Sequence, residues 1–127
     1  METQILRAGR MYGSVAREPL AGTWRQGKPD TCLILQYQRV ALLQYDPLGL
    51  ATEPVRFEAQ MAYLAENCNV VSIDEFDSHR QAGVALAPRS VIVTFDGGYA
   101  DVFYTAAAVL QEYEIPAAVF AFSSNLI

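Results

Sequence analysis

Four short apolar runs, at residues 32–37, 69–73, 91–95 and 117–122, constrain the fold of this chain most. Runs of this length, rich in branched and aromatic side chains, are typical of strands that are buried on both faces of a parallel sheet. Every connection between them contains a helical signal, and strands that alternate with helices form parallel β/α units with right-handed crossovers. The sequence therefore predicts an α/β fold with about four parallel strands and intervening helices.

Apolar stripes predict two of the helices. Pro54 suits the first position of a helix, and apolar side chains follow it on one face at Phe57, Met61, Leu64 and Cys68. A second stripe begins after Ala100 and stops before Pro116, with Val102, Ala106, Val109, Leu110 and Tyr113 on one face. Both stripes are interpreted as core packing.

An end cap predicts the third helix. Ser72 is followed three residues later by Glu75, the spacing at which the two side chains satisfy free amides at a helix start. We expect a short helix from there to about Ala82. Residues 39–54, punctuated by Pro47, Gly49 and Pro54, are predicted to be a long loop at the carboxyl end of the first strand.

The length of 127 residues allows one domain. Residues 1–31 mix glycine, proline and polar side chains without a sustained period, so we expect a loosely organised N-terminal arm with a short helix near residues 4–12. Residues 32–127 then form the β/α domain.

Charge and hydropathy exclude several functions. The net charge is −5, and no cluster of lysine and arginine is interleaved with aromatic residues, which argues against nucleic acid as a partner. No apolar run is long enough to span a membrane, and the N-terminus lacks the apolar core of a signal peptide. The sequence as written predicts a cytoplasmic protein, and an extracytoplasmic one if it is a fragment of a longer precursor.

The cysteines and the histidine do not indicate a metal or redox site. Cys32 and Cys68 lack the close spacing of zinc or redox pairs, and His79 stands without a second ligand type nearby in the sequence. We interpret the cysteines as small buried hydrophobic residues and the histidine as solvated.

The candidate site lies in "VIVTFDGGYADVF", residues 91–103, where an apolar strand runs into Asp96 and two glycines. Ligands of parallel α/β sheets bind at the carboxyl ends of strands, which favours a catalytic role for this carboxylate. Aspartate and glycine are equally ordinary residues of a turn before a helix. The residues alone leave both interpretations open.

An ordered series of motifs resembles the polysaccharide deacetylase family, which is carbohydrate esterase family 4 or the NodB-homology domain. The series runs "LILQYQRV", "RFEAQMAYL", "VVSIDEF", "PRSVIVTFDGGYAD" and "LQEYEIPAAVF", and it spans residues 32–127. In the family the corresponding segments read like "ILxYHRV", "xFExQLxYL", "VVSLDE", "PRSVxLTFDDGY" and "LxKYGIPATFF". Because the segments occur in the same order, the series is more specific than any one motif.

The resemblance implies a distorted (β/α) barrel, present here in part, and metal-dependent hydrolysis of acetyl groups on amino-sugar polymers. It implies that Asp96 is the general base, and that Tyr37, Gln38, Thr94 and Tyr99 contact the substrate. In the family an aspartate and two histidines bind zinc or another divalent metal.

This chain departs from the family pattern at the metal. The ligand aspartate is replaced by Gly97, the histidine of the first strand is replaced by Gln38, and the sequence ends at Ile127 before any histidine-pair motif. A hydrolytic zinc site uses about three protein ligands. We therefore expect no metal cofactor in this chain, and an inactive, truncated deacetylase-like domain.

Three alternatives remain beside that expectation. Another chain or copy could complete an active deacetylase, the domain could bind N-acetylated carbohydrate or another partner without hydrolysis, or the glycine turn could bind a phosphate. The last predicted strand should also leave a sheet edge exposed, so we expect a homo-oligomer or a folded-back N-terminal arm to cover it.

Overall fold

The computed structural model describes residues 2–7 and 31–123 of the 127-residue chain. Its strands are β1 (Glu2–Arg7), β2 (Thr31–Tyr37), β3 (Arg39–Val40), β4 (Ala51–Thr52), β5 (Asn69–Val70), β6 (Ser90–Asp96) and β7 (Ala117–Phe120). Its helices are α2 (Pro54–Asn67), α3 (Ile73–Ala82) and α4 (Ala107–Glu112), and the π-helical turn η2 (Val102–Ala106) directly precedes α4. No helix in these two ranges has the length and hydropathy to cross a membrane.

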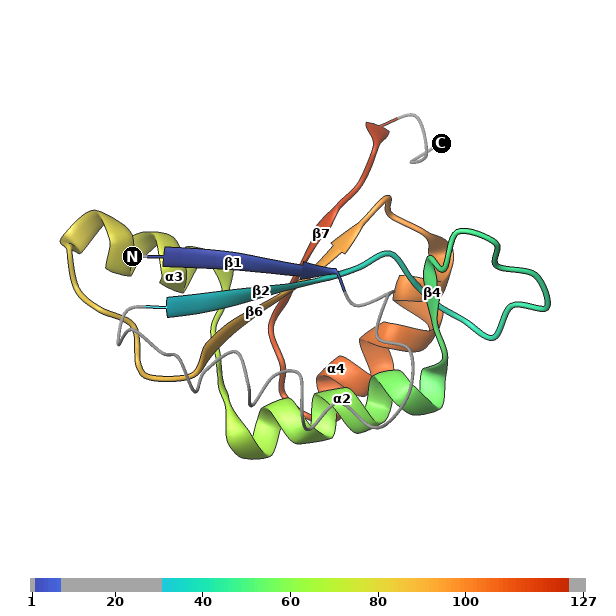
Figure 1. The fold of residues 1–127 in the computed structure, drawn as a ribbon, viewed down its shortest axis with the longest axis horizontal. Helices are drawn as coiled ribbons and strands as arrows, with labels where there is room; N and C mark the ends of the chain where they lie inside the picture. Colours follow the sequence, from blue (N-terminus) through green and yellow to red (C-terminus); the bar gives the residue numbers. More distant parts are fainter. Residues whose placement is uncertain (1, 8–30, 124–127) are drawn as a thin grey trace.

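The main sheet has five strands, and all of its paired strands are parallel. The order is β1-β2-β6-β5, and β7 pairs with β6 beyond the end of β5. Figure 1 shows β1, β2 and β6 side by side with their arrowheads toward the same end. The described strands leave the sheet open. This architecture confirms the predicted α/β fold with a partial barrel of parallel strands.

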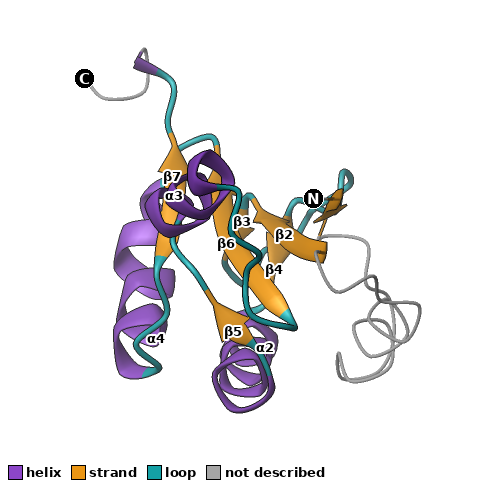
Figure 2. Ribbon diagram, turned by 90° about the vertical axis from the view of Figure 1, so that its left-hand side faces the viewer, coloured by secondary structure: helices purple, strands orange, loops and turns teal. Residues whose placement is uncertain are grey.

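Helices α2 and α4 cover one face of this sheet, and both lie on the same side of the strands (Figures 1 and 2). Side chains alternate between the faces of a strand, so every second residue of β2 and β6 points toward these helices. The core on this side contains the predicted helix stripes and the strand residues Leu33, Leu35, Tyr37, Val91, Val93 and Phe95.

Helix α3 covers the amino-terminal part of the opposite face. There Ile73 and Phe76 pack against a small cluster that is formed by Cys32, Val71, Leu86 and Ile92. No other helix of the described chain lies over this face. The carboxyl-terminal part of the face is consequently open.

The predicted starts of α2 and α3 are confirmed, with one half of the reciprocal cap at Ser72 and Glu75 present. The Ser72 hydroxyl accepts a hydrogen bond of 3.1 Å from the Glu75 amide at the start of α3. Pro54 occupies the first turn of α2, as its preference for that position predicts. Glu114, where the family motif has glycine, takes a left-handed conformation with φ of 53°.

The predicted N-terminal helix needs correction. The chain does not form a helix at Gln4 to Arg7, because Glu2–Arg7 is strand β1 and pairs with β2. The remainder of that predicted helix, residues 8–12, lies outside the described residues. Strand β1 therefore occupies the sheet edge beside β2, away from β7, and does not cover the edge that the sequence predicts to be exposed.

Candidate functional site

The candidate site lies at the carboxyl ends of β2, β6 and β7. Asp96 is the last residue of β6, and a glycine turn follows it. Gly97 and Gly98 have φ values of +98° and +63°, which side-chain-bearing residues rarely adopt. The Gly97 amide donates a hydrogen bond of 2.9 Å to the carbonyl oxygen of Phe120, so the turn is held against the end of β7.

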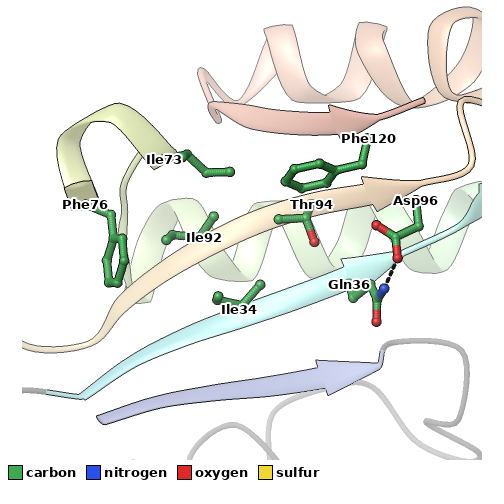
Figure 3. Close-up of a pocket in the computed structure, with 8 residues that line it drawn as sticks. All are labelled: Ile34, Gln36, Ile73, Phe76, Ile92, Thr94, Asp96 and Phe120. Carbon is green, nitrogen blue, oxygen red and sulfur yellow. Dashed lines mark hydrogen bonds between the residues drawn. The ribbon is translucent and has the colours of Figure 1, made fainter. Parts of the chain in front are cut away.

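The Asp96 side chain lies on the face of the sheet that α2 and α4 do not cover. Its Oδ2 atom accepts a hydrogen bond from Nε2 of Gln36 on the neighbouring strand (Figure 3). Thr94, two residues earlier on the same face, is buried and donates from its hydroxyl to the carbonyl oxygen of Leu35 over 3.1 Å. Thr94 thus ties β6 to β2 directly beside the carboxylate.

A groove of about 690 Å³ runs along this face and ends at the carboxylate. It is polar at the end formed by Gln36, Thr94 and Asp96. The rest of the lining is apolar and comes from β2, β6, β7 and α3: Ile34, Ile73, Phe76, Ile92 and Phe120. A site of this size can accept a small organic ligand.

A charged cluster secures the segment that follows the glycine turn. Asp101 accepts hydrogen bonds from Nε of Arg39 at 2.9 Å and from the Val40 amide at 3.1 Å. The Arg39 guanidinium also lies 5.0 Å from the ring centroid of Tyr99, a cation–π distance. The cluster joins the start of the π-helical turn to β3.

The predicted base Asp96 and the predicted substrate contact Thr94 both line the groove, and the structure places the other predicted contacts elsewhere. Tyr99 is half-exposed on the turn, with its ring beside Gly97 and Arg39. Gln38 is half-buried directly after the end of β2. Each of these two lies near the same end of the sheet.

Tyr37 belongs to the core and not to the groove. It is 2% exposed, packs between Phe57 and Phe95, and donates its hydroxyl proton to Oε1 of Gln60 over 2.7 Å. Burial raises the pKa of its phenol far above the ordinary value. In the described structure this side chain is therefore not accessible to a sugar.

Burial also raises the pKa of both cysteine thiols, that of Cys32 to about 11. Both cysteines are free, and at neutral pH they are thiols, which are weak nucleophiles. Neither lines the groove beside Asp96.

The side chains that the structure describes do not fit the divalent metal of the family. Across residues 2–7 and 31–123, no three His, Cys, Asp or Glu side chains gather closely enough to hold a metal ion. Gly97 has no side chain, and a Cβ atom added to it would lie 2.7 Å from Cε2 of Tyr99. The single histidine, His79, lies on α3, where its Nδ1 atom is 3.3 Å from the Ala85 carbonyl oxygen.

Gln36 is the site residue that the sequence interpretation missed. A signal for it exists, because it is the polar residue of an apolar strand and shares a face with Ile34. Recognising its contact with Asp96 also requires the pairing of β2 with β6, in which Gln36 lies opposite Thr94. That register is a tertiary property that strand patterning does not supply.

Solved structures of deacetylases are similar to this fold. The chain matches the de-N-acetylase from Aggregatibacter actinomycetemcomitans with a TM-score of 0.65 and 25% identity, over 73% of this chain and 38% of that one. It matches IcaB from Ammonifex degensii with a TM-score of 0.63 and 29% identity, over 72% of this chain and 38% of that one. The deacetylase PplD from Streptococcus pyogenes, at a TM-score of 0.60 and 22% identity, covers 69% of this chain and 41% of its own, and shows the fold alone.

Comparisons with protein-family models and with curated proteins find no match. The chain spans about two fifths of the length of the solved structures above. The order of its motifs, its open parallel sheet and these structural likenesses agree with one another. The chain carries part of a NodB-like domain of the polysaccharide deacetylase type.

Proposed function

We propose that this deacetylase-like domain does not hydrolyse acetyl groups by itself. The observation that carries the proposal is the pair Asp96 and Gly97 at the end of β6, where a carboxylate stands beside a residue that has no side chain. Metal-dependent hydrolysis needs about three protein ligands to bind the ion and to lower the pKa of its water to roughly 7. A base at Asp96 without that ion lacks an activated nucleophile.

Metal analysis tests this proposal. The full chain is incubated with Zn²⁺ or Co²⁺, passed through a desalting column, and analysed for bound metal. We expect no stoichiometric binding. One tightly bound ion per chain that disappears in Asp96→Asn would refute the proposal, whereas metal retained equally by Asp96→Asn would indicate adventitious sites elsewhere.

A second candidate function is an active deacetylase that another chain or copy completes. It is favoured by the retention of Asp96, Thr94 and Tyr99. Acetate release from N-acetylated chito-oligosaccharides by a co-purified complex, lost in Asp96→Asn, would support it. No release by any complex that contains the chain would exclude it.

We propose in addition that the domain binds carbohydrate without hydrolysing it. The groove beside Asp96 is open in the described chain and is large enough for a sugar unit with its substituents. An N-acetylated amino-sugar polymer is the ligand class that the resemblance implies. The cellular location of the protein is a separate prediction, and cell fractionation tests it.

A further inference from the structure

The loop between β3 and β4, residues 41–50, displays large apolar side chains to solvent. Leu42 is 78% exposed, Tyr45 is 82% exposed and Leu48 is 77% exposed. Figure 1 shows this loop projecting beyond β4, away from the main sheet. Large apolar side chains that gather on one exposed segment indicate an interaction surface.

Backbone pairing and one carboxylate hold the loop in its shape. Strands β3 and β4 pair at its base, where the Ala41 amide donates to the Thr52 carbonyl oxygen over 3.0 Å. The Asp46 carboxylate accepts from the amides of Leu50 and Ala51 at 3.0 and 2.9 Å. Asp46 is the one charged residue of the loop, so these bonds satisfy its only charge within the loop itself. An ordered loop without a free charge suits an apolar partner and loses little conformational entropy when it binds.

The groove beside Asp96 is a concave apolar surface on the same chain. Five of its eight lining residues are apolar, and the other three form the polar end at Asp96. None of residues 41–50 lines it, so the loop does not fill the groove of its own chain. Leu42 and Leu48 match the apolar walls. Tyr45 matches the polar end, because it combines an apolar ring with a hydroxyl that donates to an acceptor such as a carboxylate.

Loop and groove together approach the size of a stable dimer interface. The loop has ten residues and the groove is lined by eight, which makes 18 residues on each copy before the margins are counted. Specific interfaces use about 20–30 residues on each side. A two-fold axis forms the contact twice, because each copy offers its loop and accepts the loop of its partner.

We propose that a second copy of this chain occupies the groove, with its loop of residues 41–50 against the apolar walls and its Tyr45 at the polar end. Two copies exchange their loops in this way around a two-fold axis. A loop that fills the groove excludes a small ligand from the same place, so dimer formation and ligand binding compete. The proposal is independent of the proposed function, because neither metal binding nor acetate release enters it.

Sedimentation velocity of the full chain over a concentration series tests the proposal, and we expect a reversible dimer. The loop variant, Leu42→Ser with Leu48→Ser, should weaken dimerisation at least roughly tenfold, because it removes two large apolar side chains from each contact. The groove variant, Phe120→Ser, changes an exposed lining residue and should weaken it about tenfold. Val84→Ser is the control. Val84 is also exposed and lies outside the loop and the groove, so its change should alter dimerisation less than twofold.

A mixture of the two variants distinguishes this contact from other dimers. Their heterodimer retains one complete contact, which joins the intact loop of the groove variant to the intact groove of the loop variant. The mixture should therefore dimerise more tightly than either variant alone and less tightly than the unmodified chain. A dimer that forms through β7 edges alone, or through two loops, gives no such rescue.

Hydrogen exchange of the unmodified chain, below and above the concentration of dimerisation, needs no variant. The amides of residues 41–50 should become more protected in the dimer. Four results would each overturn the proposal: a monomer at every concentration, variant effects no larger than that of Val84→Ser, no rescue in the mixture, and unchanged exchange in the loop.

Discussion

At the scale of residues, the proposed function depends on the two neighbours Asp96 and Gly97. By resemblance, Asp96 is proposed to match the general base of the family and Gly97 to replace its ligand aspartate. Gly97 has a φ of +98°, which disfavours any residue with a side chain at this place in the turn. Restoring a ligand here requires the Tyr99 ring to move as well as a new side chain.

Gly97→Ala should therefore destabilise the protein more than Gly83→Ala. Both glycines have positive φ, at +98° and +65°, which costs an alanine about 1–2 kcal/mol. A Cβ atom at Gly83 would meet nothing within 4 Å, whereas at Gly97 it would lie 2.7 Å from the Tyr99 ring. Urea unfolding should show roughly 1 kcal/mol or more of additional loss at Gly97. Equal losses would mean that the ring moves away freely.

Asp46 makes a second residue-scale prediction, about pH. Its carboxylate accepts from the Ala51 and Leu50 amides at 2.9 and 3.0 Å, and these bonds lower its pKa below the ordinary 3.8. Because the pKa of Asp46 is lower in the folded protein than in the unfolded chain, its carboxylate stabilises the fold above pH 3.8. This stability is lost as the pH falls through the pKa of the folded state.

The Tm difference between the wild-type chain and Asp46→Asn should therefore be largest above about pH 5 and should shrink toward pH 2. Glu66→Gln serves as the charge control, because Glu66 lies on α2, far from this loop in the sequence. A difference that grows on acidification would contradict the proposed role of the Asp46 carboxylate.

At the scale of elements, local signals explain most of what the sequence predicted. The Ser72 cap, the Pro54 start and the apolar stripe of α2 depend on neighbours within one or two turns, so they can be recognised without tertiary information. Residues 100–112 also form the expected helix, apart from the wide turn η2 within it.

Features that depend on partners distant in the chain were harder to predict from the sequence. Strand β1 looks irregular in sequence and becomes a strand because it pairs with β2, from which residues 8–30 separate it. Tyr37 was assigned to the substrate by motif resemblance, yet strand alternation places it on the core face with Leu35 two residues before it. The Gln36–Asp96 contact spans 60 residues and needs the β2–β6 register.

The α3 cap gives a testable magnitude at this scale. Ser72→Ala removes the acceptor for the Glu75 amide and should cost about 1 kcal/mol in urea unfolding. Ser78→Ala is the matched control on the same exposed helix, since its hydroxyl bonds back to the Asp74 carbonyl oxygen and alanine favours helix. A loss at Ser78 equal to that at Ser72 would show that the cap has no special role.

At the scale of the whole molecule, β7 is an edge of the sheet that residues 2–7 and 31–123 form. Val119 and Phe120 of this strand are exposed, and β6 is the one described strand that pairs with β7. An apolar edge of a parallel sheet promotes association. Light scattering should show a concentration-dependent dimer of the full chain, and Val119→Lys should weaken it. If the wild-type chain and Val119→Lys are both monomeric at every concentration, the prediction of a homo-oligomer is wrong.

We propose that the chain retains the deacetylase base at Asp96 and lacks the ligands that would hold the metal beside it. Acetate release from N-acetylated chito-oligosaccharides by the purified full chain, in the presence of Zn²⁺ or Co²⁺, is the decisive measurement. We expect release no faster than in the blank without protein, and no difference between the wild-type chain and Asp96→Asn. Metal-dependent release that Asp96→Asn abolishes would contradict it.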